Sequence, residues 1–98
     1  MDNTTTKWDA ANYLDSQEDI ALYLEAAIAE DDPALLAAAI GDVLRTKGMT
    51  EAAAATGVTR AGLYRGFSEE GDPKLSTFMT VLKHIGVEIS LTPKKTAA

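Results

Sequence analysis

Apolar residues recur at helical spacing through most of this chain, and the pattern predicts helices over 16–29, 33–46, 50–56, 59–67 and 76–85. The first two of these helices carry stripes of four apolar residues on one face: Ile20, Leu24, Ala27 and Ile28 in the first, and Leu36, Ile40, Val43 and Leu44 in the second. The pattern is therefore typical of an all-α protein.

Residues that start and stop helices lie at the predicted boundaries. Asp15 or Ser16 can cap the first helix, and Asp32, which precedes a proline, can cap the second. Gly48 is expected to end the second helix in a left-handed conformation. Ser76 is expected to cap the last helix.

The two ends of the chain have different patterns. Residues 1–6 are polar and predict a frayed start, and Trp8, Tyr13 and Leu14 are expected to anchor the segment that follows. After Gly86, residues 87–91 alternate apolar and polar side chains and predict a short C-terminal strand. Its partner is either an N-terminal segment or a second subunit. We expect an acidic N-terminal segment with one helix over 1–32, a helix-turn-helix domain over 33–91 and a tail over 92–98.

Length and composition restrict the function classes. A chain of 98 residues has the size of one domain, and without cysteine it forms neither disulfides nor thiolate metal sites. No apolar run approaches the ~18 residues of a membrane span, and we expect a cytoplasmic protein. His84 is the single histidine of the chain and lies near a predicted helix end. Without a second histidine or a cysteine, it is not expected to form a metal or catalytic site. We expect no enzyme activity, no cofactor and no metal.

The net charge of −6 is distributed unevenly along the chain. Residues 1–42 hold ten acidic side chains and one lysine, a charge of −9, whereas residues 43–98 hold eight basic and five acidic ones, a charge of +3. Two faces for two different partners would explain this asymmetry. Acidic side chains that simply cover solvated helices would explain it as well.

Residues 49–67 have the spacing of two short helices joined by a tight turn. Ala53 is small enough for the helix crossing, Gly57 can adopt positive φ, Val58 can pin the turn to the core, and Leu63 can be buried. Thr59 can cap the second helix. This spacing predicts a helix-turn-helix motif, and the alternative is an ordinary helical hairpin with a glycine turn.

A helix-turn-helix motif would expose a set of residues suited to reading DNA. Arginine bonds bidentately to guanine, and threonine or tyrosine reaches a phosphate or a base edge. The candidates for base reading are Thr59, Arg60, Ala61, Tyr64 and Arg65, and the candidates for phosphate contact are Lys47, Thr50 and Lys74.

Several blocks of sequence together resemble the addiction-module antidote proteins, a HigA-like group of the lambda-repressor-like superfamily. They are GVTRAGLYR at 57–65, WDAA at 8–11, YL at 13–14, YLEAA at 23–27, GDV at 41–43 and GDP at 71–73. The resemblance implies a five-helix lambda-repressor-like DNA-binding domain with an N-terminal helical extension. Gly66 and Phe67 depart from the family's pattern, and Gly62 and Gly66 each weaken the second helix by about 1 kcal/mol relative to alanine.

The resemblance also implies a function. It implies an antitoxin that neutralises a RelE/HigB-like ribonuclease and represses its own operon, as a homodimer on a palindromic operator. Because an RNA-cleaving toxin must be basic, Glu18, Asp19 and Glu25 are the expected toxin contacts. A stand-alone regulator of the same fold and a protein-interaction module without DNA affinity are the alternatives.

Overall fold

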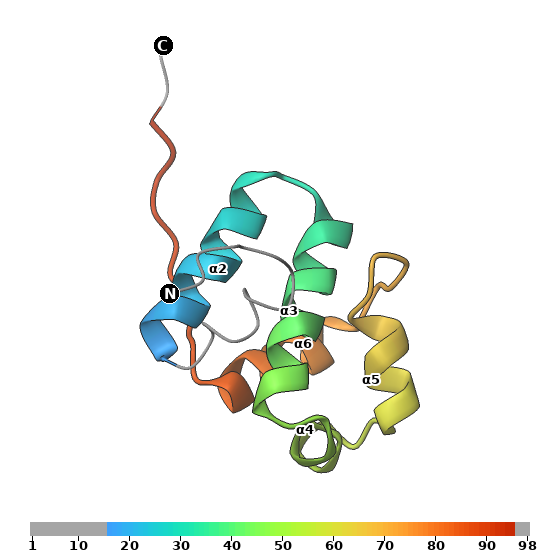
Figure 1. The fold of residues 1–98 in the computed structure, drawn as a ribbon. Helices are drawn as coiled ribbons and strands as arrows, with labels where there is room; N and C mark the ends of the chain where they lie inside the picture. Colours follow the sequence, from blue (N-terminus) through green and yellow to red (C-terminus); the bar gives the residue numbers. More distant parts are fainter. Residues whose placement is uncertain (1–15, 96–98) are drawn as a thin grey trace, which may run out of the picture.

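The structure, a computed structural model, describes residues 16–95, which form five α-helices. The helices are α2 (Gln17–Ala29), α3 (Pro33–Lys47), α4 (Met49–Thr56), α5 (Arg60–Gly66) and α6 (Leu75–Ile85), and the described residues contain no strand (Figure 1). The predicted all-α class is therefore confirmed. The anchors expected at Trp8, Tyr13 and Leu14 lie outside the described residues.

Side-chain caps define the starts of the first two helices, as predicted. The Ser16 hydroxyl accepts a hydrogen bond from the Asp19 backbone N–H at 3.0 Å. The Asp32 carboxylate accepts from the backbone N–H groups of Ala34 at 3.0 Å and Leu35 at 3.4 Å. These bonds satisfy N–H groups that have no partner within the helix.

Two predictions at the C-terminal end are wrong. Ser76 lies inside α6, whose N-cap residue is Lys74 and has no side-chain cap bond. Residues 87–91 form no strand, because Val87 completes the end of α6: its N–H donates to the Leu82 carbonyl at 3.1 Å, beside Gly86 at φ +88°. These bonds form a Schellman cap, in which the residue after the left-handed glycine belongs to the helix end.

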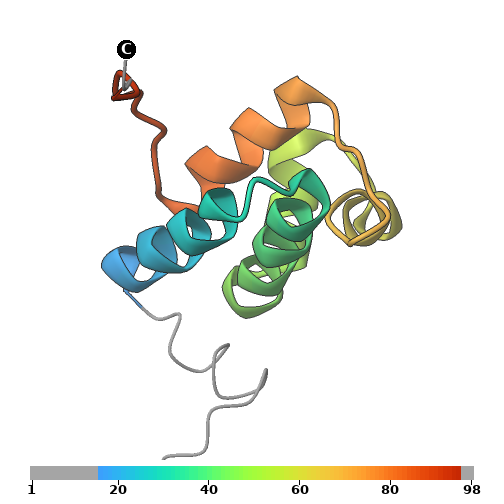
Figure 2. The same cartoon turned by 90° about the horizontal axis from the view of Figure 1, so that it is seen from above.

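α3 lies at the centre of the arrangement. It packs against α2, α4, α5 and α6, and both views place α2 and α5 on opposite sides of it (Figures 1 and 2). The hydrophobic core includes residues from all five helices: Ile20, Leu24, Ala27, Ile40, Val43, Leu44, Met49, Ala52, Leu63, Val81, Leu82 and Ile85. The helices that hold the candidate DNA-reading and toxin-binding residues are thus fixed by one shared core.

The predicted apolar stripes are largely buried, with two differences. Ile28, expected in the core, is 56% exposed in the last turn of α2. Leu36 is half-buried rather than buried.

Candidate nucleic-acid interface

The turn between α4 and α5 has the geometry predicted from its glycine. Gly57 adopts φ +77°, which is the left-handed region that glycine enters without steric cost, and its N–H donates to the Ala53 carbonyl at 2.9 Å. The Thr56 hydroxyl donates to the Ala52 carbonyl at 2.9 Å and accepts from the Val58 N–H at 3.1 Å. Ala53, predicted as the small residue at the crossing of the two helices, is half-buried. Its neighbour Ala52 is completely buried.

The inner face of α5 is fixed by a cap at its start and two apolar anchors. The Thr59 hydroxyl oxygen accepts from the Gly62 N–H at 3.0 Å, as predicted for the N-cap. Leu63 and Phe67 are each 1% exposed, and Val58 packs against the same core. α5 is therefore held rigidly on one side although it has only seven residues.

The outer face of α5 carries all five predicted base-reading residues. Thr59, Arg60, Ala61, Tyr64 and Arg65 are exposed, and α5 lies at the edge of the molecule (Figures 1 and 2). The Thr59 oxygen accepts one hydrogen bond in the cap, so its hydroxyl hydrogen and its second lone pair remain to contact another molecule. The fold thus brings these residues together on one accessible surface.

The two glycines of α5 have different surroundings. A Cβ built at Gly62 would lie 2.8 Å from Val58 Cγ1 and 3.1 Å from Thr59 Oγ1, so glycine is the residue that lets the capped turn close. At Gly66 a Cβ would meet only Pro73 Cβ, at 3.7 Å, an ordinary contact. Despite both glycines, α5 is formed over its whole length.

A chain of polar contacts that sequence reasoning missed reaches the outer face of α5 from α2. The Tyr23 hydroxyl donates to Asp42 Oδ2 at 2.7 Å, and Arg45 Nη1 donates to Asp42 Oδ1 at 2.9 Å. The Arg45 guanidinium carbon lies 5.7 Å from the centroid of the Tyr64 ring, a cation–π distance. The i, i+3 spacing of Asp42 and Arg45 was the available signal, whereas the contact with Tyr64 had none in the sequence.

The surroundings of Tyr23 raise the pKa of its phenol. Burial, then the hydrogen bond to Asp42 and the negative charge of Asp42, raise the pKa of Tyr23 to about 12. The phenol therefore remains a neutral hydrogen-bond donor through the physiological pH range.

The candidate phosphate contacts lie at helix ends. Lys47 is the last residue of α3, Thr50 lies exposed in the first turn of α4, and Lys74 is the exposed N-cap of α6. Glu51, also in the first turn of α4, has its carboxylate next to Gly48. This negative charge interacts favourably with the helix dipole at the start of α4.

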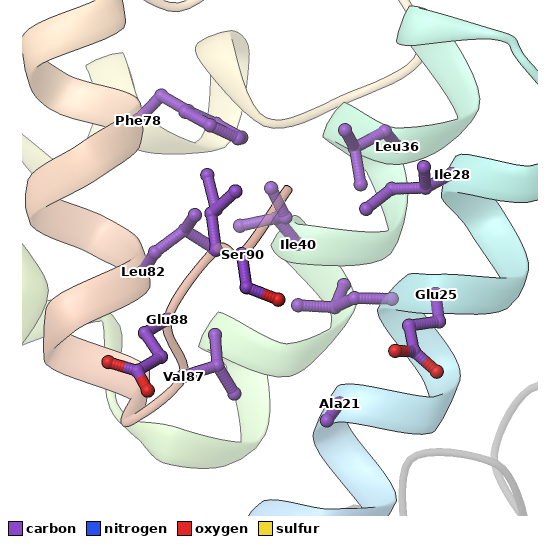
Figure 3. Close-up of a pocket in the computed structure, with 12 residues that line it drawn as sticks. Ala21, Glu25, Ile28, Leu36, Ile40, Phe78, Leu82, Val87, Glu88 and Ser90 are labelled. Atoms are coloured by element: carbon purple, nitrogen blue, oxygen red, sulfur yellow. The ribbon is translucent and has the colours of Figure 1, made fainter. Parts of the chain in front are cut away.

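The acidic residues proposed from sequence for toxin contact lie on α2, across α3 from α5. Glu18, Asp19 and Glu25 are all exposed. Glu25 also borders an apolar groove between α2, α3, α6 and residues 87–90, with Glu88 at another part of its rim (Figure 3). The lining of this groove is mainly apolar: Ala21, Leu24, Ile28, Leu36, Ile40, Phe78, Leu82, Val87 and Ile89. Only Glu25 of the three acidic residues is among the lining residues.

The described residues offer few other candidates for a catalytic, metal-binding or membrane-spanning role. His84 lies in the last turn of α6, and its Nε2 is buried without a hydrogen-bond partner in residues 16–95. Within the same residues, no cluster of three or more histidine, cysteine, aspartate or glutamate side chains could hold a metal ion. None of the described helices combines the length and apolarity needed to cross a membrane.

Comparison with known proteins places this architecture in a family. Residues 4–93 match the model of a family described as "Probable addiction module antidote protein". An uncharacterized protein of Haemophilus influenzae is 34% identical over 90 residues, which cover 92% of this chain and 93% of that protein. No solved structure matches the chain. The match spans nearly the whole sequence, and the chain belongs to the family of probable addiction module antidote proteins.

Proposed function

We propose that this protein is the antitoxin of a type II toxin–antitoxin module, which neutralises a RelE/HigB-like ribonuclease toxin and represses its own operon. Membership of an antidote family indicates an antitoxin role, a toxin partner and a non-enzymatic protein. The proposal of DNA binding rests on the outer face of α5. Arg60, Tyr64 and Arg65 are exposed there, and Leu63 and Phe67 anchor the opposite face in the core.

α4 and α5 act as a lambda-repressor-like helix-turn-helix, with α5 as the helix that enters the major groove. Arg60 and Arg65 read guanine edges bidentately, and Thr59, Ala61 and Tyr64 contact neighbouring bases. The rigid attachment of α5 supports this role, because base readout requires side chains projecting from a fixed helix. Lys47, Thr50 and Lys74 contact phosphates and set the register of the protein on the duplex.

The protein binds DNA as a homodimer on a palindromic operator. One helix of seven residues contacts too few base pairs for useful specificity, and two-fold symmetry doubles the number that is read.

The toxin binds the side of the molecule that carries α2. An RNA-cleaving protein needs a basic surface, and Glu18, Asp19 and Glu25 provide an exposed acidic complement. The apolar groove beside Glu25 supports this assignment, because a stable interface needs a desolvated apolar centre within a polar rim. α5 lies on the other side of α3, so toxin and DNA use separate surfaces (Figure 1).

The test is a growth and reporter assay on the two-gene module. The product of the neighbouring open reading frame should stop growth when produced alone and should be neutralised when this chain is produced with it. The Arg60→Ala, Arg65→Ala double variant should still restore growth but should no longer repress a reporter under the module's promoter. A neighbouring product that has no effect on growth would contradict the antitoxin role, and unchanged repression by the double variant would contradict the role of α5.

A further inference from the structure

We propose that Tyr23, Asp42 and Arg45 form a positioning relay that fixes the Tyr64 ring on the DNA-reading face of α5. This inference rests on the proposed function of α5, and it adds three positioning residues outside the helix-turn-helix motif. Tyr23 belongs to α2, so the relay joins the helix with the acidic surface to the helix that reads DNA.

The relay uses both oxygens of one carboxylate. Asp42 Oδ2 accepts from the Tyr23 hydroxyl at 2.7 Å, and Asp42 Oδ1 accepts from Arg45 Nη1 at 2.9 Å. A carboxylate with one fixed donor on each oxygen cannot rotate without breaking a hydrogen bond. Asp42 is therefore held by Tyr23 in the orientation that places Arg45.

Arg45 is long and flexible unless it is held. Its side chain is 49% exposed, and its ion pair with Asp42 is an i, i+3 pair on the surface of α3. Such a pair by itself contributes little, because fixing two side chains in water costs entropy. The additional hydrogen bond from Tyr23 orders the Asp42 side chain and so lowers the entropy cost of the ion pair. The paired guanidinium carbon lies 5.7 Å from the centre of the Tyr64 ring.

The contact with Arg45 restricts the Tyr64 ring to one orientation. Tyr64 is 39% exposed on the outer face of α5, where a free ring would exchange between rotamers. A side chain that is already ordered before binding loses less entropy when it contacts a ligand. The relay thus favours operator binding without a direct contact between Tyr23 or Asp42 and DNA.

The first experiment uses the free protein and needs no DNA. Aromatic ¹³C–¹H NMR spectra would follow the Tyr64 ring in Tyr23→Phe, in Asp42→Asn and in the matched control Glu18→Gln, which removes an exposed acid from the same helix. Tyr23→Phe removes only the hydroxyl, so the half-buried ring keeps its packing. We expect the Tyr64 ring signals to shift in both relay variants and to remain in place in the control. Unchanged Tyr64 signals in Asp42→Asn would overturn the relay.

The second experiment measures coupling in DNA binding. Fluorescence anisotropy with a duplex from the region upstream of the gene would give affinities for Tyr23→Phe, Tyr64→Ala and the double variant at one salt concentration. Tyr23→Phe should weaken binding by about threefold to tenfold, which is within the range expected for the net loss of one typical hydrogen bond. In the Tyr64→Ala background the same substitution should cause no further loss.

A parallel cycle supplies the control. Tyr23→Phe and Arg65→Ala should be additive, because the Arg65 side chain is not part of the relay. Equal losses from Tyr23→Phe with and without Tyr64 would overturn the proposal, since they would indicate a general effect on the fold. Arg45→Lys keeps a cation near the ring and should retain more affinity than Arg45→Ala, and equal losses in both would contradict positioning through the ring. If the wild-type protein bound no upstream duplex, the proposed function would fail, while the NMR experiment would still decide whether the relay exists.

Discussion

Gly41 of α3 lies directly against the backbone carbonyl of Phe67, the C-cap residue of α5. A Cβ at position 41 would overlap the Phe67 carbonyl oxygen, and this oxygen belongs to the main chain and cannot rotate away as a side chain could. Both residues are buried. The close approach of α3 to the end of α5 thus depends on the absence of a side chain at Gly41.

Substitution of Gly41 by alanine should destabilise the protein. The added methyl group forces α3 and α5 apart, and overpacking of this kind costs about 1–3 kcal/mol. Urea denaturation followed by far-UV circular dichroism would measure the free energy of unfolding.

Gly66→Ala is the matched control, because its Cβ would make only an ordinary contact with Pro73 at 3.7 Å. This substitution should leave the free energy of unfolding unchanged or raise it by up to about 1 kcal/mol, through the better helix propensity of alanine. Equal stability of both variants would contradict the steric role of Gly41.

Arg60→Ala and Arg65→Ala should each weaken specific DNA binding and leave the fold intact, since both side chains are exposed. Loss of a bidentate guanine contact costs about 1–3 kcal/mol and depends on the base at that position. Affinities for the operator and for single-base variants, measured by anisotropy, would reveal this dependence.

Lys74→Ala supplies the comparison, because a lost phosphate contact lowers affinity for all sequences alike and reduces the salt slope by about one. Operator binding that is unchanged in the double arginine variant would exclude α5 as the recognition helix.

The DNA-bound protein should be a dimer whose half-sites lie about 10 base pairs apart or a multiple of that distance. Light scattering of the free protein and of its complex with DNA would give the stoichiometry, and insertions of five base pairs between half-sites would test the spacing. Tight binding of a monomer to a lone half-site would contradict this expectation.

Reversal of the acidic side chains Glu18, Asp19 and Glu25 to lysine should slow toxin association and reduce its dependence on salt. The physical reason is the loss of long-range attraction between this surface and a basic toxin. Stopped-flow measurements at low ionic strength would give the association rate.

DNA binding should survive the same reversal or become tighter, because negative charge that repels phosphates has been removed. The control for toxin association is the reversal of Glu69 and Glu70 to lysine, which makes the same kind of charge change in the loop after α5. This control should leave the association rate with the toxin unchanged. An association rate that is unaffected by the α2 variant would exclude this surface for docking.

The stability of the fold should fall at high pH through Tyr23. The pKa of Tyr23 is raised from 10.0 to about 12, so the folded protein keeps the phenolic proton where the unfolded chain has lost it. The contribution of Tyr23 is fully present below about pH 10 and is lost as the pH rises through about 12. Urea denaturation at about pH 9 and about pH 11 should therefore show a smaller difference between wild type and Tyr23→Phe at the higher pH. A difference that stays constant would show that Tyr23 titrates alike in both states.

The sequence determined the helices and most of their ends, because these depend on neighbours within a few residues. Apolar spacing located all five described helices, and Ser16, Asp32, Gly57 and Thr59 occupy the capping and turn positions expected from their chemistry. The set of residues exposed on α5 also followed from local periodicity, since burial of Leu63 places its neighbours on the opposite side.

Tertiary structure decided the features that depend on residues far apart in the chain. The alternating pattern of 87–91 could not show that Val87 completes a helix end, because an isolated strand and an extended segment have the same periodicity. The contact of Gly41 with Phe67 and the path from Tyr23 through Asp42 and Arg45 to Tyr64 join segments up to 41 residues apart. Such contacts depend on how α2, α3 and α5 pack around their shared core, a geometry that local spacing leaves open.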